Sequence, residues 1–87
     1  MSWISELEEY GHNFLIDELV WYIEQGRTPL SVRLVEDSDR IGYEFVFSES
    51  GPAFLNVNSE ALQDSWTEAK EIVSKSSHLK GMRFVHS

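Results

Sequence analysis

The chain has 87 residues, no cysteine, a formal net charge of −8 and an isoelectric point near 4.6. Its length suits one domain spanning residues 1–87, and an apolar content of 41% is too high for a disordered chain. The missing cysteines exclude disulfides and thiolate metal sites, and the acidity argues against direct binding to nucleic acid or to anionic membranes.

The N-terminal part of the chain is predicted to be helical from about residue 3 to residue 25. Gly11-His12-Asn13 interrupts it, so that either the helix kinks there or Asn13 caps a second helix. Gly26, followed soon by Pro29, is typical of a helix end. We therefore expect one long kinked helix or two shorter ones.

Three strands are predicted in the middle of the chain. Residues 30–34 alternate apolar and polar side chains, residues 41–48 place Ile41, Tyr43, Phe45 and Phe47 on one face, and residues 53–57 form a third strand. Polar turns at 36–40 and 49–52 separate the three strands. Because the turns are short, consecutive strands should pair as an antiparallel meander.

The C-terminal part is predicted to contain a second helix, capped by Asn58 or Ser59. Residues 81–86 form either a short fourth strand or an ordered tail. The helix buries a stripe at helical spacing, formed by Leu62, Trp66, Ala69, Ile72 and Val73. The predicted fold is a two-layer α+β domain in the order α-β-β-β-α-β, with the final strand uncertain.

The acidic residues are unevenly distributed. The first 26 residues contain no Lys or Arg and six acids, whereas residues 58–87 balance four acids against four bases. On a helical wheel, the core face of the N-terminal helix consists of Leu15, Ile16, Leu19, Val20, Tyr22 and Ile23. Another sector carries Phe14 and Trp21 beside Asp17, Glu18 and Glu24. If the helix is unbroken from residue 3, Trp3, Glu6 and Tyr10 join that sector.

Two interpretations of this aromatic sector compete. In one it is a second core face, which meets the C-terminal segment or another copy of the chain. In the other it is an exposed contact site, because aromatic side chains with a charged rim are typical of binding hot spots. Surrounding carboxylates would then steer a basic partner toward the site.

The second helix adds an acidic ridge of Glu60, Asp64, Glu68 and Glu71, which taken alone is typical of an ordinary solvated helix face. If this ridge and the N-terminal acids faced the same way, their carboxylates would be arranged somewhat like duplex phosphates. The predicted partner-binding residues are Trp3, Glu6, Glu9, Tyr10, Phe14, Asp17, Glu18, Trp21, Glu24, Glu60, Asp64 and Glu68.

Catalytic and metal-binding chemistry finds little support in the sequence. His12, His78 and His86 are scattered, and no nucleophile stands at a recognisable spacing from any of them. Asp37-Ser38-Asp39 lacks the downstream ligands of a calcium loop. We therefore expect no enzyme activity, no metal and no cofactor. The predicted element order is also that of double-stranded-RNA-binding domains, but the start of the second helix is acidic where such domains are basic, which argues against RNA binding.

These features favour a small binding protein that blocks a basic protein. Nucleic-acid-binding proteins and nucleases are examples of such basic partners. In size, acidity and lack of catalytic groups the chain resembles phage-encoded antagonists of host nucleases, including anti-CRISPR proteins, and bacterial immunity proteins. This resemblance is one of class and assigns no role to any residue. The alternative is a self-associating protein with the aromatic sector as its dimer seam. The acids near the N-terminus are unlike a signal peptide, and no long apolar run follows, so we expect a cytoplasmic protein without membrane contact.

Overall fold

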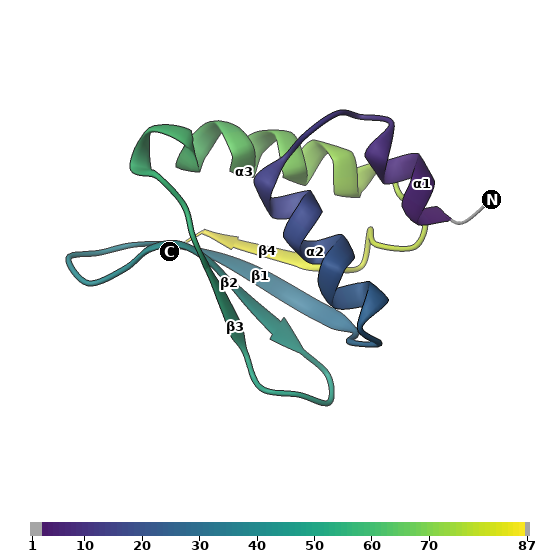
Figure 1. Ribbon diagram of the computed structural model, residues 1–87, viewed down its shortest axis with the longest axis horizontal. Coiled ribbons are helices and arrows are strands. Elements are labelled where there is room, and N and C mark those ends of the chain that lie inside the picture. Colours follow the sequence, from purple (N-terminus) through teal and green to yellow (C-terminus); the bar gives the residue numbers. More distant parts are fainter. Residues whose placement is uncertain (1–2, 87) are drawn as a thin grey trace.

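The computed structural model describes residues 3–86, except for the side chain of Glu8, and has two layers, with helices on one face of a four-stranded sheet (Figure 1). The predicted α+β class is confirmed. The elements are α1 (Trp3–Glu8), α2 (Phe14–Glu24), β1 (Pro29–Glu36), β2 (Ile41–Phe47), β3 (Ala53–Asn56), α3 (Ser59–Ser74) and β4 (Arg83–His86). Within residues 3–86, no helix has the length and apolar character needed to cross a bilayer.

The N-terminal helix is divided into two at Gly11-His12-Asn13, as the second of the two predicted alternatives requires. Gly11 has a φ of +96°, a left-handed conformation that favours glycine. Asn13 is extended, and its side-chain oxygen accepts a hydrogen bond from the backbone N–H of Ile16. This is an N-cap, so α2 starts in a new direction and does not continue α1.

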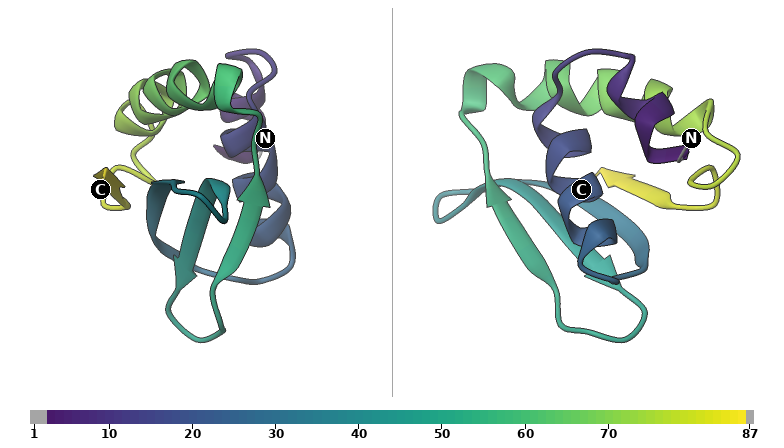
Figure 2. Two further views of the ribbon diagram at one scale, coloured as in Figure 1. Left: turned by 90° about the vertical axis from the view of Figure 1, so that its left-hand side faces the viewer. Right: turned by 45° about the vertical axis from the view of Figure 1, so that its right-hand side comes forward.

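The sheet has the strand order β3-β2-β1-β4 and is mixed. The β1–β2 and β2–β3 pairs are antiparallel, as predicted for consecutive strands joined by short turns. The uncertain C-terminal strand forms as β4 and pairs in parallel with β1, so the sheet as a whole is not a purely antiparallel meander. After β3 the chain crosses over the sheet through α3 and returns to the far edge, so β3 and β4 form opposite edges (Figure 2).

The core lies between the inner face of the sheet and the helices α2 and α3. The Tyr22 ring of α2 contacts the rings of Phe45 and Phe47, with centroids 5.2 and 5.1 Å away. Trp66 of α3 stacks on Tyr43 at 5.7 Å. The Tyr43 hydroxyl donates a buried 2.7 Å hydrogen bond to the carbonyl oxygen of Leu62. Each helix is thus attached to the sheet through an aromatic pair.

A glycine at residue 42 is required by the close approach of β2 and β3. A methyl group on Gly42 would collide with the backbone carbonyl of Leu55. We expect Gly42→Ala to lower the free energy of unfolding by about 1–3 kcal/mol, because the two strands must move apart. Gly51→Ala is the control, since nothing lies within 4 Å of the added atom. Urea unfolding followed by circular dichroism measures both, and equal effects would contradict the prediction.

Two core tyrosines should make the fold sensitive to alkali. Burial raises the pKa of Tyr43 to about 12, and burial together with a hydrogen bond to Glu18 raises the pKa of Tyr22 to about 12. In the unfolded chain both ionise near a pKa of about 10. Their contribution is therefore complete below about pH 10 and is lost as the pH rises toward 12. Unfolding free energies measured across this range should fall, and the fall should be shallower in Tyr43→Phe.

Candidate protein-binding surface

Helix α2 turns an aromatic row away from the core. Phe14 and Trp21 are 49% and 54% exposed and lie two helical turns apart. Asp17 lies exposed between them, and Glu24 is exposed beyond Trp21. Because each of these aromatic side chains leaves about half of its surface in water, this row is not a second core face of the described domain.

The predicted single stripe of four aromatics does not form, because the break at residues 11–13 separates its two halves. Trp3 is half-buried and stacks on His78, with ring centroids 4.7 Å apart. Tyr10 lies under the ammonium group of Lys75, 5.6 Å from the ring centroid, just beyond the end of α3. Glu6 and Glu9 are exposed in this same N-terminal region. Trp3 therefore packs against the C-terminal segment, as the first of the two interpretations predicts.

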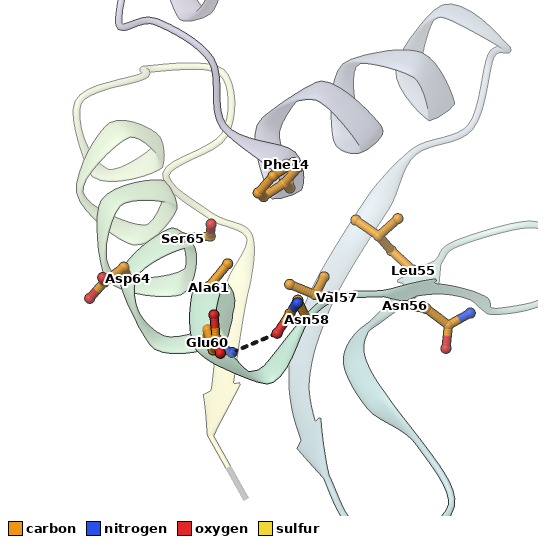
Figure 3. A pocket seen from close by; sticks show the side chains of 9 residues that line it. All are labelled: Phe14, Leu55, Asn56, Val57, Asn58, Glu60, Ala61, Asp64 and Ser65. Atoms are coloured by element: carbon orange, nitrogen blue, oxygen red, sulfur yellow. Dashed lines mark hydrogen bonds between the residues drawn. The ribbon is translucent and has the colours of Figure 1, made fainter.

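Phe14 instead borders a groove that lies between the start of α2, the start of α3 and strand β3. The groove has a volume of about 650 Å³. The side chains of Leu55, Val57 and Ala61 point toward Phe14 from β3, from the following loop and from α3 (Figure 3). Glu60 and Asp64, two residues of the predicted ridge, also line it. The groove is therefore apolar at its centre and acidic at one side.

A buried asparagine holds the two helices beside this groove. Asn13 is only 2% exposed, and its amide nitrogen donates to the carbonyl oxygen of Ser65 at 3.1 Å and to Glu68 Oε1 at 2.9 Å. Its oxygen caps α2 through Ile16. Every polar atom of the Asn13 side chain is thus satisfied, and the start of α2 is fixed against the middle of α3.

The carboxylates of the helical layer fall into two groups. Four have partners: Asp17 contacts His12 at 2.7 Å, Glu18 accepts from the Tyr22 hydroxyl, Glu68 accepts from Asn13 and Glu71 contacts Lys75. Among the residues that the structure describes, no ion pair involves the others of the predicted set, which are Glu6, Glu9, Glu24, Glu60 and Asp64. The groove thus has two exposed, unneutralised carboxylates on its acidic side.

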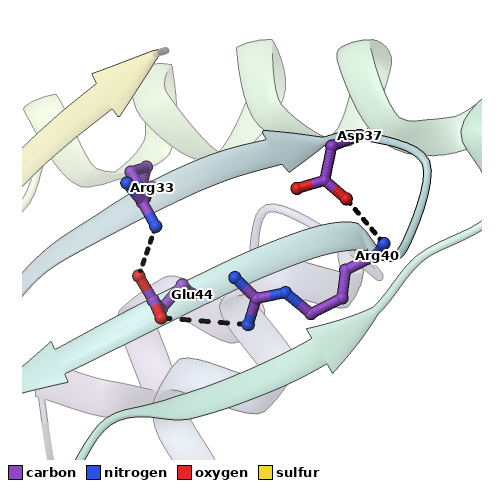
Figure 4. A network of polar contacts seen from close by, with 4 residues as sticks. All are labelled: Arg33, Asp37, Arg40 and Glu44. Carbon is purple, nitrogen blue, oxygen red and sulfur yellow. Dashed lines mark hydrogen bonds and ion pairs between the residues drawn. The ribbon is translucent and has the colours of Figure 1, made fainter.

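On the outer face of the sheet, the carboxylate of Glu44 is paired with two arginines. Glu44 lies 2.9 Å from Arg33 and 4.0 Å from Arg40, and Asp37 accepts a hydrogen bond from the backbone of Arg40 (Figure 4). The Arg40 guanidinium also covers the ring of Phe54 at 4.6 Å. Glu44 is therefore neutralised on the outer face, whereas Glu60 and Asp64 beside the groove form no ion pair within the described residues.

The histidines lie apart from one another in the fold. His12 contacts Asp17, His78 stacks on Trp3, and His86 lies 3.3 Å from Gln63. In the part of the chain that the structure describes, no three His, Asp or Glu residues are placed to hold a metal ion.

Comparisons with known proteins place this chain in no family. No protein-family model matches the sequence, and neither the curated proteins nor the solved structures contain a significant match. The function must therefore be inferred from the surface itself.

Asn13 and Asn58 provide a matched test of the attachment between α2 and α3. Both cap helices, but Asn58 is exposed and its side chain accepts a hydrogen bond from the N–H of Glu60, whereas the Asn13 side chain also donates two hydrogen bonds to α3. Asn13→Asp keeps the cap, loses both donors and places a carboxylate beside Glu68, so it should cost about 1–3 kcal/mol of unfolding free energy. Asn58→Asp should change it by less than about 0.5 kcal/mol, because Asp and Asn cap equally well.

Chemical denaturation measures both variants. If Asn13→Asp and Asn58→Asp were equally stable, the hydrogen bonds from Asn13 to α3 would not hold the helices together. Acidification should restore part of the stability of Asn13→Asp, because protonation removes the repulsion from Glu68.

Proposed function

We propose that this protein is a non-enzymatic binding protein that docks on a basic protein through the groove and the exposed row of α2, and blocks that protein. One observation carries the proposal: Phe14, half exposed, shares a groove with Glu60 and Asp64, whose carboxylates form no ion pair with any described residue. An apolar anchor that is bordered by uncompensated charge of one sign fits a partner of the opposite sign.

The two components of the surface have different roles in binding. Phe14 and Trp21 expose apolar surface that a bound partner would bury. Large aromatic side chains supply much of the binding energy at protein interfaces. The carboxylates lose hydration on binding, so they contribute mainly to the encounter rate and to the choice of partner. A basic partner that also presents an apolar or aromatic contact is therefore required.

Blocking follows when the partner's basic surface is itself a binding site for an anion. The chain has 15 Asp and Glu against seven Lys and Arg, and the N-terminal segment through Gly26 has no Lys or Arg. A nucleic-acid-binding protein, including a nuclease, has such a basic groove, and the acidic helical layer would compete there with phosphates. On this proposal the protein is an inhibitor that acts by charge mimicry.

Affinity capture tests the proposal. The immobilised protein should retain a basic protein from a cell lysate at low ionic strength and release it as the salt concentration rises. A matched column carrying Glu60→Gln with Asp64→Gln should retain less of the same protein. If no basic protein binds, or if the two columns retain equal amounts, the proposal is wrong.

Single substitutions distinguish contact residues from core residues. Phe14→Ala or Trp21→Ala should weaken binding of the captured partner by about 1–3 kcal/mol and leave the fold intact. Val46→Ala is the control, because Val46 is 37% exposed on the outer face of the sheet. Trp66→Ala, at 4% exposure, should instead destabilise the fold by about 3–5 kcal/mol. Calorimetry of binding and thermal unfolding give both quantities.

Self-association through the same aromatic row is the competing function, and the exposure of Trp21 and Phe14 is what favours it. Light scattering at low and high ionic strength separates the two. A dimer with an apolar seam should persist or tighten at high salt, whereas the proposed inhibitor should remain monomeric without its partner.

A further inference from the structure

Strand β3 is a free edge of the sheet, and its outward backbone groups can be assigned. The backbone N–H of Val57 donates to the carbonyl of Ile41, which fixes that pair as a hydrogen-bonded one. Hydrogen-bonded and non-hydrogen-bonded pairs alternate in an antiparallel ladder, so Leu55 also bonds toward β2. The N–H and C=O groups of Phe54 and Asn56 therefore point away from the sheet, where no described strand pairs with them.

The groove lies directly beside this edge. Leu55 and Asn56 of β3 line it, and Phe14 stands across from them (Figure 3). A chain that pairs with β3 would have every second side chain on the inner side of the sheet, next to Leu55 and the groove. Its other side chains would emerge on the outer side, where Arg40 covers Phe54.

We propose that the groove and the β3 edge together receive an extended segment of the basic partner, which adds to the sheet as a fifth strand beside β3. This inference rests on the proposed function and specifies its binding mode. Inner positions of the segment would alternate between an apolar side chain against Phe14 and Leu55, and Lys or Arg beside Glu60 and Asp64. Outer positions would be polar and uncharged, because a cation there would meet Arg40.

The energetics favour a basic segment over a second copy at this edge. In strand addition, backbone hydrogen bonds supply affinity and the alternate side chains supply specificity. A β3-to-β3 contact between two copies would bring together two molecules of net charge −8, each with the carboxylates of Glu60 and Asp64 near the seam. Like charges repel there, whereas a cationic segment is attracted.

A synthetic peptide tests this mode directly. The probe is the blocked peptide Thr-Lys-Thr-Val-Thr-Lys-Thr, which reads the same in both directions and therefore assumes no strand orientation. We expect it to slow amide hydrogen exchange at Phe54 and Asn56 by at least about tenfold, while Leu55, already bonded to β2, changes little. Peptide binding that leaves Phe54 and Asn56 unprotected would overturn the inference.

Two sets of control peptides sharpen the result. Replacing both Lys by Glu should abolish binding, because Glu60 and Asp64 would then repel the peptide. In an added strand, only every second amide of the peptide bonds to β3. These amides belong either to the Thr residues or to the Lys and Val residues. N-methylation of the bonded set should therefore abolish binding, and N-methylation of the other set should not. Equal loss from both sets would indicate electrostatic docking without strand pairing and would overturn the inference.

Failure of this inference can be told apart from failure of the proposed function. If a captured basic protein binds in a Phe14-dependent manner but leaves the amides of Phe54 and Asn56 unprotected, the proposed function stands and strand addition is wrong. If these amides are already protected in the free protein, increasingly so at higher protein concentration, a second copy occupies the edge and strand addition by a partner is wrong.

Discussion

The buried side chain of Asn13 is the interaction on which the arrangement of the helical layer depends. Its amide oxygen caps α2, and its amide nitrogen donates hydrogen bonds to two positions on α3. A buried amide without partners would be costly, so α2 and α3 have to meet where all of these bonds are made. This contact fixes the start of α2 against the middle of α3, and the groove lies beside it, between Phe14, β3 and the first turns of α3.

The parallel pairing of β4 with β1 imposes a second constraint. The chain must travel from one edge of the sheet to the other after β3, and α3 makes that crossing (Figure 2). Its first turn therefore lies beside β3, and its last turn lies near α1. This places Glu60 and Asp64 at the groove that the free edge of β3 also borders, whereas Lys75 is left at the other end, beside Tyr10.

Local patterns predicted most of the fold, because each element has a clear period and clear end signals. The sequence predicts caps at Asn13 and Asn58, and both residues cap helices. The parallel β4 and the groove could not be predicted, since they depend on contacts between residues far apart in the chain. Asn13 and Glu68, for example, are 55 positions apart. Leu55 and Val57 looked like ordinary strand residues, and only the edge position of β3 makes them line a surface.

The same topology explains why the negative charge matters more by position than by amount. A small domain has little stability to lose, on the order of 0.1 kcal/mol per residue, and unpaired like charges reduce it further. On the outer face of the sheet, Glu44 is neutralised by two arginines. Beside the groove, Glu60 and Asp64 have no such compensation among the described residues. Solubility alone would be served equally by dispersed charge, so these carboxylates next to an apolar groove and a strand with one open edge are better explained by a cationic, extended partner.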